Sequence, residues 1–407
     1  MKRTLLLATT AGVLAFAGSA ATPSDAKAEG LQANIGGFYN WLVIGRDQDP
    51  GAFGRGEVDP RSYDFNQRGR YTVSGSYTLD TGMTVGFQSQ HEIQQSFGTD
   101  RAYVFMSGDF GMLQAGNHQS AAYQLHTFVG GAGWGLDDTA HTNEIVAPGA
   151  TSWNTILTVP YGPVYIGPRV NYFTPRINGF QAGVSFTPDS SRGSDGQRFV
   201  TDKAIDLVEP IQEDIISAAV NFAGTFQGFD VSASAGGEFS LSTGDFTVGA
   251  VEDEFGVFST GIALGWQNWE ASFAYAYRNM SAFSAPLPVR NRDLFDPQDP
   301  GADTALVGGD DGSRQDFGGS LTMAVGPWTV GPSFGYVRDK SSQNQSLPGA
   351  TQTFGREELW IAELGANYAL GPGVNIRGSA MYVDWDSDES QRDGDGIGVG
   401  VGMALTF

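Results

Sequence analysis

The sequence has no cysteine and few basic residues. Among its 407 residues, 23 lysines and arginines stand against 45 aspartates and glutamates, so the formal net charge is −22. The lack of cysteine excludes a disulfide scaffold and a thiolate metal site. The acidic balance argues against nucleic acid as a partner, because phosphate binding needs a basic surface.

Long apolar segments are also missing. Beyond the N-terminus, no run reaches the roughly 18 apolar residues that a membrane-spanning helix needs. The N-terminus itself has Lys2 and Arg3, an apolar stretch over 4–17, and small residues at 18–20 and 26–28. This pattern predicts a secretory signal peptide over 1–28, cleaved after residue 20 or after residue 28, and a mature chain over 29–407. An exported chain without apolar helices can cross a membrane only with strands.

Apolar residues instead alternate with small or polar ones from residue 30 to the end of the chain. In the last eleven residues, every odd position from Ile397 to Phe407 is apolar and every even position is small or hydroxylated. Charged residues are only 17% of the chain, whereas aromatic residues are 12% and there are 57 glycines. Period-two alternation with this composition is typical of strands with one lipid face and one small, polar face.

The connections between these segments are short and long in turn. Seven short turns lie near 79–82, 108–111, 175–179, 224–228, 267–268, 326–327 and 371–373. Eight longer stretches lie near 44–64, 94–99, 119–164, 189–214, 241–257, 281–314, 340–357 and 387–395. Sixteen strands of about 9–12 residues follow, longer than the five or six residues usual in soluble sheets. The predicted fold is all-β: a transmembrane antiparallel β-barrel of 16 strands with long extracellular loops, in the cell outer membrane.

Several segments resemble the general diffusion porins of Gram-negative bacteria, particularly the alphaproteobacterial type. Residues 109–116 resemble the turn and strand before the constriction loop of that family, and residues 119–123 resemble the opening of the loop. Residues 169–180 resemble the strand, turn and strand that follow it. The C-terminal Phe407 resembles the signal read by the barrel assembly machinery. In its pattern of strands and connections, the chain is similar to the family over most of 30–407. In its motifs, it is similar only over the segments just named.

The resemblance implies a passive diffusion channel for ions and small hydrophilic solutes, without a cofactor. It also implies a homotrimer surrounded by outer-membrane lipid and lipopolysaccharide. The third loop, 119–164, would fold into the lumen as a constriction loop and narrow the pore. The residues agree that this loop is unusual, because it is the longest and has no strand pattern.

Alternation along the strands indicates which charges face the lumen. If Tyr71 and Val170 face lipid, the neighbouring arginines on those strands point inward. We therefore predict an eyelet in which wall arginines face loop acids across the pore, so that the transverse field selects solutes by charge and the gap selects them by size. The residues predicted for the pore constriction are Arg68, Arg70, Arg101 and Arg169 on the wall and Asp137, Asp138 and Glu144 on the loop.

Acidic side chains are dense in the last outer connection. Asp386, Asp388, Asp393 and Asp395 could bind Ca²⁺, which prefers clustered carboxylate oxygens, or could bridge lipopolysaccharide through divalent ions. The alternative is a solvated acidic loop that limits aggregation, and the spacing does not match the twelve-residue EF-hand loop.

Two other functions remain open on sequence alone. A substrate-specific channel for a sugar or another small solute would line its path with aromatic residues, and Tyr123, Trp134 and Trp153 lie in the third loop. These residues could equally pack against the barrel wall. An outer-membrane hydrolase would need a base beside a nucleophile. The four histidines, at positions 91, 118, 126 and 141, lie in no recognisable catalytic motif. We therefore expect no enzyme activity.

Overall fold

The computed structural model describes most of the chain from residue 32 onward. The described residues are 32–49, 51–53, 56–58, 61–93, 99–134, 145–146, 158–160, 162, 165–189, 212–243, 256–279, 313–340, 344–347, 350–353, 356–387 and 393–407. The predicted signal peptide over 1–28, with its two candidate cleavage positions, lies outside them. Among the described residues, no helix has the length and hydropathy needed to cross a membrane.

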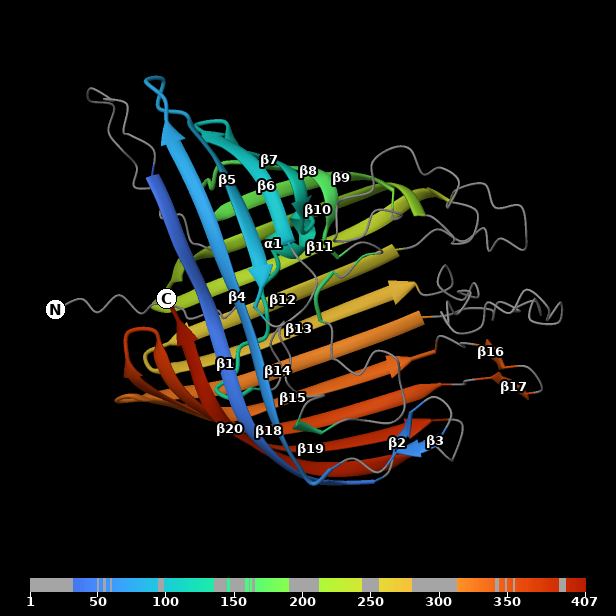
Figure 1. Cartoon of the computed structure of the whole chain (residues 1–407). Helices are drawn as coiled ribbons and strands as arrows, with labels where there is room; N and C mark the ends of the chain where they lie inside the picture. Colours follow the sequence, from blue (N-terminus) through green and yellow to red (C-terminus); the bar gives the residue numbers. More distant parts are fainter. Residues whose placement is uncertain are drawn as a thin grey trace.

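Sixteen antiparallel strands form one closed barrel (Figure 1), which confirms the predicted fold. Each strand pairs with its neighbours along the chain. In chain order, the strands are β1 (Gln32–Gln48), β4 (Tyr63–Thr78), β5 (Thr84–Glu92), β6 (Thr99–Gly108), β7 (Gly111–His118), β8 (Gly167–Phe173), β9 (Phe180–Asp189), β10 (Gln212–Phe226), β11 (Phe229–Thr243), β12 (Gly256–Trp266), β13 (Trp269–Asn279), β14 (Ser313–Val325), β15 (Trp328–Asp339), β18 (Glu357–Gly371), β19 (Val374–Ser387) and β20 (Gly394–Thr406).

The first and last strands close the barrel. β1 pairs with β20 over eleven registered positions, from Phe38 opposite Thr406 to Gln48 opposite Gly396. Beyond this ladder, Gly37 and Phe407 exchange two backbone hydrogen bonds of 2.9 and 3.0 Å. No barrel strand is therefore left with an unpaired edge, which in a membrane would leave backbone groups without partners.

All seven predicted short turns are present and join strands at one end of the barrel (Figure 1). Positive φ values mark several of them, such as Gln227 and Gly228, which connect β10 to β11 with φ of 51° and 85°. Two consecutive positive values are characteristic of the type I′ hairpin turn, which is why glycine stands there. At the other end, two longer connections carry small hairpins that the sequence pattern did not predict: β2 (Gly51–Phe53) with β3 (Gly56–Val58), and β16 (Asn344–Leu347) with β17 (Ala350–Thr353).

Several strands are longer than the expected 9–12 residues. β1 has 17 residues, and β10, β11 and β18 have 15 each. The extra residues lie toward the end with the long connections and are charged or polar, as in Arg46 to Gln48 of β1 and Glu357 and Glu358 of β18. Strand pairing thus continues into water, where it needs no apolar outer face.

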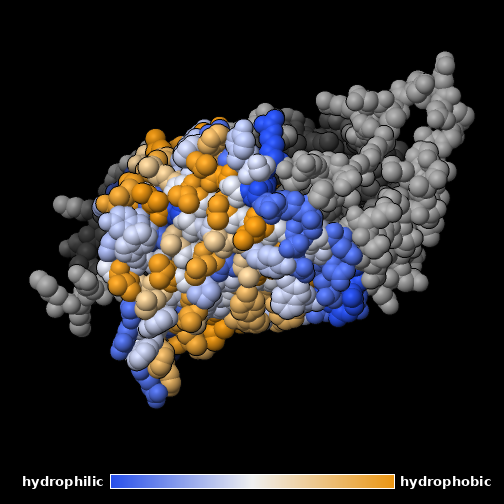
Figure 2. Space-filling view, turned by 90° about the horizontal axis from the view of Figure 1, so that it is seen from below, coloured by the Kyte–Doolittle hydropathy of each residue, from blue (hydrophilic) through white to orange (hydrophobic). Residues whose placement is uncertain are grey.

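Apolar side chains cover the outside of the barrel. Residues at alternate positions are exposed there, as in Ile397, Val399, Val401 and Met403 of β20, and Figure 2 shows the resulting apolar surface with hydrophilic residues at one end of it. Aromatic rings border this band. Tyr275, Phe317, Tyr336 and Trp360 contact one another across four strands near the end with the long connections, and Trp328 and Tyr368 contact each other near the short turns. Two such girdles mark the two interfaces of a bilayer.

A charge on the outer face of β20 should destabilise the barrel. Val401 lies near the middle of that strand and is 56% exposed. Val401→Arg should lower the free energy of unfolding in lipid vesicles by about 2–4 kcal/mol, because the guanidinium would lie in hydrocarbon. Urea titration followed by tryptophan fluorescence measures this, with Val401→Leu as the control. Equal stability of the two variants would contradict the assignment of this face to lipid.

Candidate functional site

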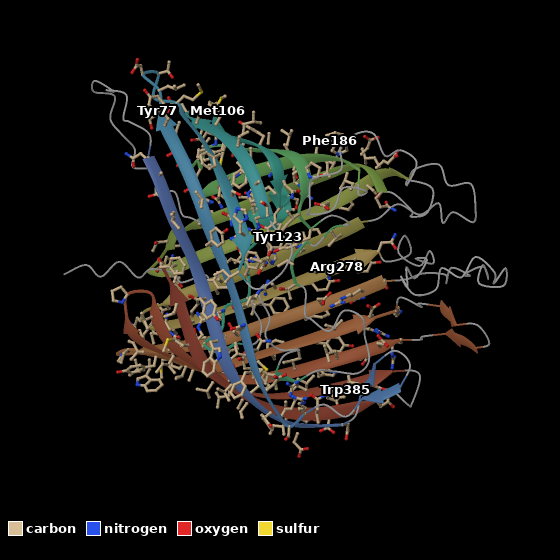
Figure 3. The ribbon with its side chains drawn as sticks, viewed as in Figure 1. Tyr77, Met106, Tyr123, Phe186, Arg278 and Trp385 are labelled. Carbon is tan, nitrogen blue, oxygen red and sulfur yellow. The ribbon has the colours of Figure 1, made fainter. Side chains whose placement is uncertain are left out.

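The connection between β7 and β8, residues 119–166, enters the barrel and is called loop 3 here. It starts with the short helix α1 (Ala121–Gln124), whose N-cap Ser120 accepts a hydrogen bond of 3.3 Å from the backbone N–H of Tyr123. Most of its described residues are buried. Figure 3 shows Tyr123 of this loop among the side chains of the inner wall, whereas Phe186 of β9 lies on the outer side. The expected inward folding of this loop is therefore seen in its described residues.

The first part of loop 3 follows the wall from strand to strand. Ser185, Ser217, Ser234, Ser272 and Ser379, called here the wall serines, each lie at an inward position on a different strand. Backbone N–H groups of the loop donate to their hydroxyls: Ala121 to Ser185 on β9 (3.0 Å), Ala122 to Ser217 on β10 (3.0 Å), Thr127 to Ser234 on β11 (2.7 Å), Gly130 to Ser272 on β13 (2.8 Å) and Trp134 to Ser379 on β19 (2.6 Å).

These hydrogen bonds explain why serine suits this part of the wall. A loop with no regular secondary structure has backbone N–H groups that must find partners when it is buried. A small hydroxyl provides an acceptor and still lets the loop backbone approach the sheet closely. Each such bond contributes about 1 kcal/mol, so the series as a whole fixes the path of the loop.

Two glycines allow a close approach of the loop to β18. A β-carbon on Gly133 would overlap the carboxylate of Glu363 on β18, and one on Gly365 would overlap the backbone N of Gly133. The neighbouring Trp134 is 1% exposed, and its indole Nε1 donates to the carbonyl oxygen of Arg377 over 3.1 Å. Glycine is required here because loop and wall are in backbone contact.

The second part of loop 3 returns along the same wall. Thr158 lies against Gly318 of β14, Val159 contacts β13 and Gly162 lies against Glu238 of β11. At the end of the loop, the hydroxyl of Tyr165 accepts hydrogen bonds from Gln119 (2.6 Å) and from Arg101 of β6 (3.4 Å). The described residues of both parts of the loop therefore rest on the wall.

A buried ion network holds the return path. Arg278 on β13 donates to the carbonyl oxygen of Val159 over 2.7 Å and forms an ion pair with Asp316 on β14. Arg314 contacts the same carboxylate at 2.8 Å and Asp339 on β15 at 4.0 Å. Two positive and two negative groups thus balance one another inside the wall, and Figure 3 shows Arg278 in the barrel interior. Unpaired, any one of them would be costly to bury.

The predicted wall arginines lie on the inside of the barrel but in different surroundings. Arg70 contacts Glu92 of β5 at 2.5 Å, and Arg68 lies 4.0 Å from the same carboxylate. Arg101 contacts Tyr165 of loop 3. Arg169 is only 4% exposed and is paired with Glu238 at 3.4 Å, beneath the loop. Arg169 therefore links β8 to β11 beneath the loop. Arg68, in contrast, keeps about 29% of its side chain exposed.

The predicted loop acids Asp137, Asp138 and Glu144 lie outside the described residues, so the opposed-charge eyelet stays a prediction. The structure adds residues that the sequence reasoning missed. Glu92 binds the Arg68 and Arg70 pair, and Arg46 of β1 forms an ion pair of 3.3 Å with Asp64. Their inward parity was the available signal, because both occupy lumen-facing positions on strands that pair with β4.

The described histidines have structural contacts. His91 stacks on Tyr71 on the outer face, and His118 stacks on Tyr103 with ring centroids 4.0 Å apart. His126 of loop 3 shares a hydrogen bond of 3.3 Å with Ser259 of β12. Burial, and secondarily the charge of Arg278, lower the pKa of His126 to about 3, so its ring is neutral near pH 7. His141 lies outside the described residues.

The aromatic residues of loop 3 pack against other groups. Tyr123 is buried between Phe128 and Tyr165, and Trp134 is buried on the wall. Neither presents an exposed ring to a passing solute, as a sugar slide would require. Trp153 lies outside the described residues.

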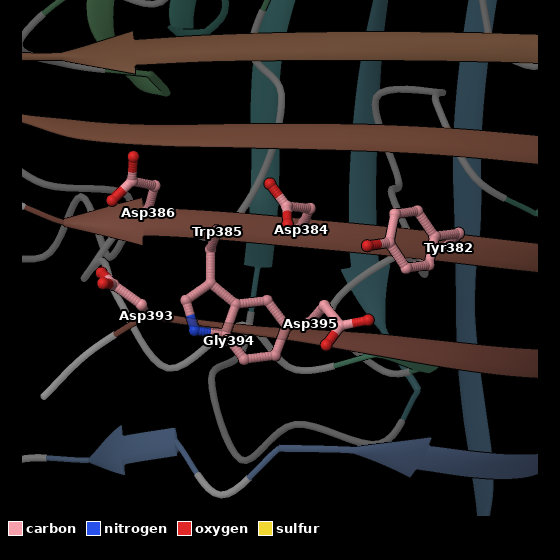
Figure 4. A pocket seen from close by; sticks show the side chains of 7 residues that line it. All are labelled: Tyr382, Asp384, Trp385, Asp386, Asp393, Gly394 and Asp395. Atoms are coloured by element: carbon pink, nitrogen blue, oxygen red, sulfur yellow. The ribbon is translucent and has the colours of Figure 1, made fainter. Parts of the chain in front are cut away.

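The acidic residues of the last connection lie around a depression of about 410 Å³ between β19 and β20, near the aromatic Trp385. Figure 4 shows that the carboxylates of Asp384, Asp386, Asp393 and Asp395 spread apart instead of converging on one point. Among the described residues, no group of three or more His, Asp or Glu side chains is arranged to hold a metal ion. Asp388 lies outside that part of the chain.

A closed barrel of sixteen antiparallel strands, apolar outside and lined by its third loop, defines a channel of the porin type. Residues 8–388 match the family described as Gram-negative porin, and the chain belongs to this family. It is thus an outer-membrane diffusion channel.

Solved structures share the fold at low sequence identity. The anion-selective porin from Comamonas acidovorans is 16% identical, with 93% of this chain and 100% of that chain covered and a TM-score of 0.55. OmpT of Vibrio cholerae is 11% identical, with 93% and 100% covered and a TM-score of 0.53. The outer membrane channel DcaP of Acinetobacter baumannii is 11% identical, with 93% and 98% covered and a TM-score of 0.55. No curated protein sequence matches the chain.

Removing Arg278 should loosen loop 3. Arg278→Met leaves the carbonyl of Val159 without this donor and leaves Asp316 with Arg314 alone. We expect a loss of about 3–5 kcal/mol in stability, as for other broken buried ion pairs. Thermal unfolding in detergent measures it. Arg338→Met is the control, because Arg338 pairs with Glu358 on the exposed outer side. A smaller loss for Arg278→Met than for the control would contradict the anchoring role.

Proposed function

We propose that ions and small hydrophilic solutes pass between loop 3 and the inner faces of β4 and β5. The observation that carries this proposal is the path of the loop: the wall contacts of its described residues fall on β6 to β20 and on Leu42 and Ile44 of β1. The inner face of β4 and β5 instead carries Arg68, Arg70, Thr72, Gln88 and Gln90. These side chains form a polar surface suited to hydrated solutes.

Charge selection in this passage would come from both sides. Arg68 keeps part of its side chain exposed, and Asp137 and Asp138 belong to the loop that faces it in our proposal. Opposed charges would orient polar solutes and disfavour apolar ones, and the width of the gap would set a size limit. Wall residues beneath loop 3, such as Arg169, would contribute less to charge selection because the loop covers them.

Neutralising single charges should shift ion selectivity in opposite directions. Arg68→Gln should raise the cation-to-anion permeability ratio about fivefold, and Asp138→Asn should lower it by a similar factor, since a unit charge about 8 Å away in water changes the free energies of a cation and of an anion by about 0.5 kcal/mol each, in opposite directions. Reversal potentials of single channels in a salt gradient measure the ratio. Asp230→Asn, near the short turn between β10 and β11, is the control.

Saturable block of the current by one class of sugar or acid, instead of ohmic currents, would favour a substrate-specific channel over the general one. Unchanged selectivity in both Arg68→Gln and Asp138→Asn would remove the eyelet from the proposal.

We also infer that the chain assembles as a homotrimer through the outer face of β4 and β5. This face differs from the rest of the apolar band, because it carries Gln67, Ser89 and His91 at lipid-facing positions. Gln67 accepts a hydrogen bond of 2.7 Å from Tyr39, and Ser89 contacts His91 at 2.9 Å. Polar groups within a bilayer are costly unless protein covers them. The related OmpT of Vibrio cholerae is described as a trimer.

A bulky apolar residue in this face should disrupt the assembly but not the barrel. Ser89→Phe is tolerated by lipid, yet it would prevent close packing of a second copy. Thr260→Phe on the outer face of β12 is the matched control. Light scattering after size exclusion in detergent should show monomers for Ser89→Phe and trimers for the control and the parent chain. Trimers in all three would exclude this face.

We also propose two interactions of the barrel with other components of the outer membrane. The side chain of Phe407 is exposed at the end of β20, where the barrel assembly machinery could read it. Asp384, Asp386 and Asp395 lie outside the wall beyond Tyr382, where lipopolysaccharide bridged by divalent cations, Ca²⁺ included, could contact them.

A further inference from the structure

Most basic side chains of the described barrel wall point inward, as expected for a sheet whose outer face lies in hydrocarbon. The inward-facing ones are Arg46, Arg68, Arg70, Arg101, Arg169, Arg278, Arg314 and Arg377. Arg338 near the end of β15, Lys340 just after it and Arg356 just before β18 instead lie on the outer face, at the end with the long connections. We call these three residues the outer basic cluster.

The register of the sheet brings this cluster together. Arg338 on β15 lies opposite Glu358 on β18. Lys340 and Arg356 each lie two residues beyond this pair and so fall on the same outer face. The backbone N–H of Lys340 donates to the carbonyl oxygen of Ser313 on β14 over 2.8 Å, which keeps this residue in line with the sheet.

Glu358 is a carboxylate that contacts the cluster. Its Oε1 lies 3.6 Å from Nε of Arg338 and 3.3 Å from Nε of Arg356, yet these side chains remain 37% and 43% exposed. At this edge of β15 and β18, three cations thus surround one carboxylate. Like charges at neighbouring positions of paired strands repel one another. An anion placed over the cluster would relieve this repulsion.

A row of aromatic rings lies beside the cluster, toward the middle of the barrel. Tyr336 is two positions from Arg338 on the same outer face, and its ring centroid lies 4.3 Å from that of Trp360 on β18. Phe317 and Tyr275 continue the row across β14 and β13. Such rings lie at the level of the head groups in a bilayer. The outer basic cluster therefore lies among the head groups of the outer leaflet.

We propose that the outer basic cluster binds the phosphorylated head group of an outer-leaflet glycolipid of the lipopolysaccharide type. The aromatic row would pack against the sugar rings and the first carbons of the acyl chains. Arginine suits the phosphate, because its planar guanidinium can donate two parallel hydrogen bonds to it. A glycolipid fits better than free phosphate, since its acyl chains would hold the phosphate at the level of the cluster, beside rings that face lipid.

This site extends the proposed contact of the acidic residues with lipopolysaccharide and differs from it in needing no divalent cation. Asp386 on β19 lies opposite Glu358 on the same outer face, so the acidic surface begins on the neighbouring strand. The cluster would bind a phosphate directly, whereas the carboxylates would need a bridging cation such as Ca²⁺. Chelation by EDTA therefore separates the two contacts.

Binding of purified lipid A to the full barrel in detergent containing EDTA tests the site, with native mass spectrometry as the readout. The parent chain should retain lipid A. Arg338→Gln and Arg356→Gln should each weaken binding about fivefold, and together about 25-fold, since each basic residue beside an anionic membrane surface contributes about that factor. Arg61→Gln is the matched control, because Arg61 is exposed at the same end of the barrel, before β4.

Glu358→Gln distinguishes binding from a merely structural role of the arginines. This change removes the carboxylate that competes with a phosphate for Arg338 and Arg356. Lipid A should therefore bind about fivefold more tightly, by the same factor per charge. Weaker binding in this variant would show that the ion pairs only hold the strand ends in place, and would overturn the site.

Other outcomes would also contradict the proposal. Equal affinity of the parent chain and of both arginine variants would overturn it. Release of lipid A from the parent chain by EDTA would leave only contacts bridged by divalent cations. Equal retention of dephosphorylated lipid A or of phosphatidylglycerol would overturn the phosphorylated glycolipid, and displacement by inorganic phosphate would assign the cluster to free phosphate. Single-channel conductance should be unchanged in every variant, so an altered current would bear on the proposed passage and not on the lipid site.

Discussion

Every feature of this molecule depends on satisfying backbone hydrogen bonds where no water is present. Only a sheet closed on itself does so with strands, and the pairing of β1 with β20 provides that closure. A closed sheet in turn imposes a period of two, with one face toward lipid and one toward the lumen. The outer face has one requirement, to be apolar, and the sequence meets it with few exceptions. The inner face is free to vary, and its variation determines what loop 3 can bind.

The inner wall has two surfaces of different chemistry under one loop. Along β9 to β13 the loop is bound by hydroxyls that accept its backbone N–H groups, supported by the Arg278 and Asp316 network. Along β18 to β20 it is bound by apolar packing over glycine. Hydrogen bonds specify the path of a backbone, and apolar contacts keep water out of the far end. A loop without regular structure needs both in order to hold one shape.

Much of the fold could be predicted from sequence because its rules are local. The alternation from Ile397 to Phe407, the seven turns and the inward parity of Arg68 and Arg70 all follow from neighbouring residues. The course of loop 3 could not be predicted, since its partners are serines and glycines on strands far along the chain. A signal for the apolar wall was present, however. Continuous apolar runs such as 41–44 of β1 indicate a strand covered on both faces, which in a barrel implies an occupant of the lumen.

The apolar cluster in which Ile145 and Val146 of loop 3 are buried has a consequence for the assembly of the barrel. It contains Leu42 and Ile44 from the first strand and lies against the glycines of the last, so it does not exist until the two ends of the sheet meet. Loop 3, although it belongs to the first half of the chain, cannot reach its final position earlier than the final seam. The lumen is therefore narrowed at the moment of closure, and a partly zipped barrel has no finished constriction. The closing of the barrel between β1 and β20 and the narrowing of the lumen by loop 3 therefore occur in the same step.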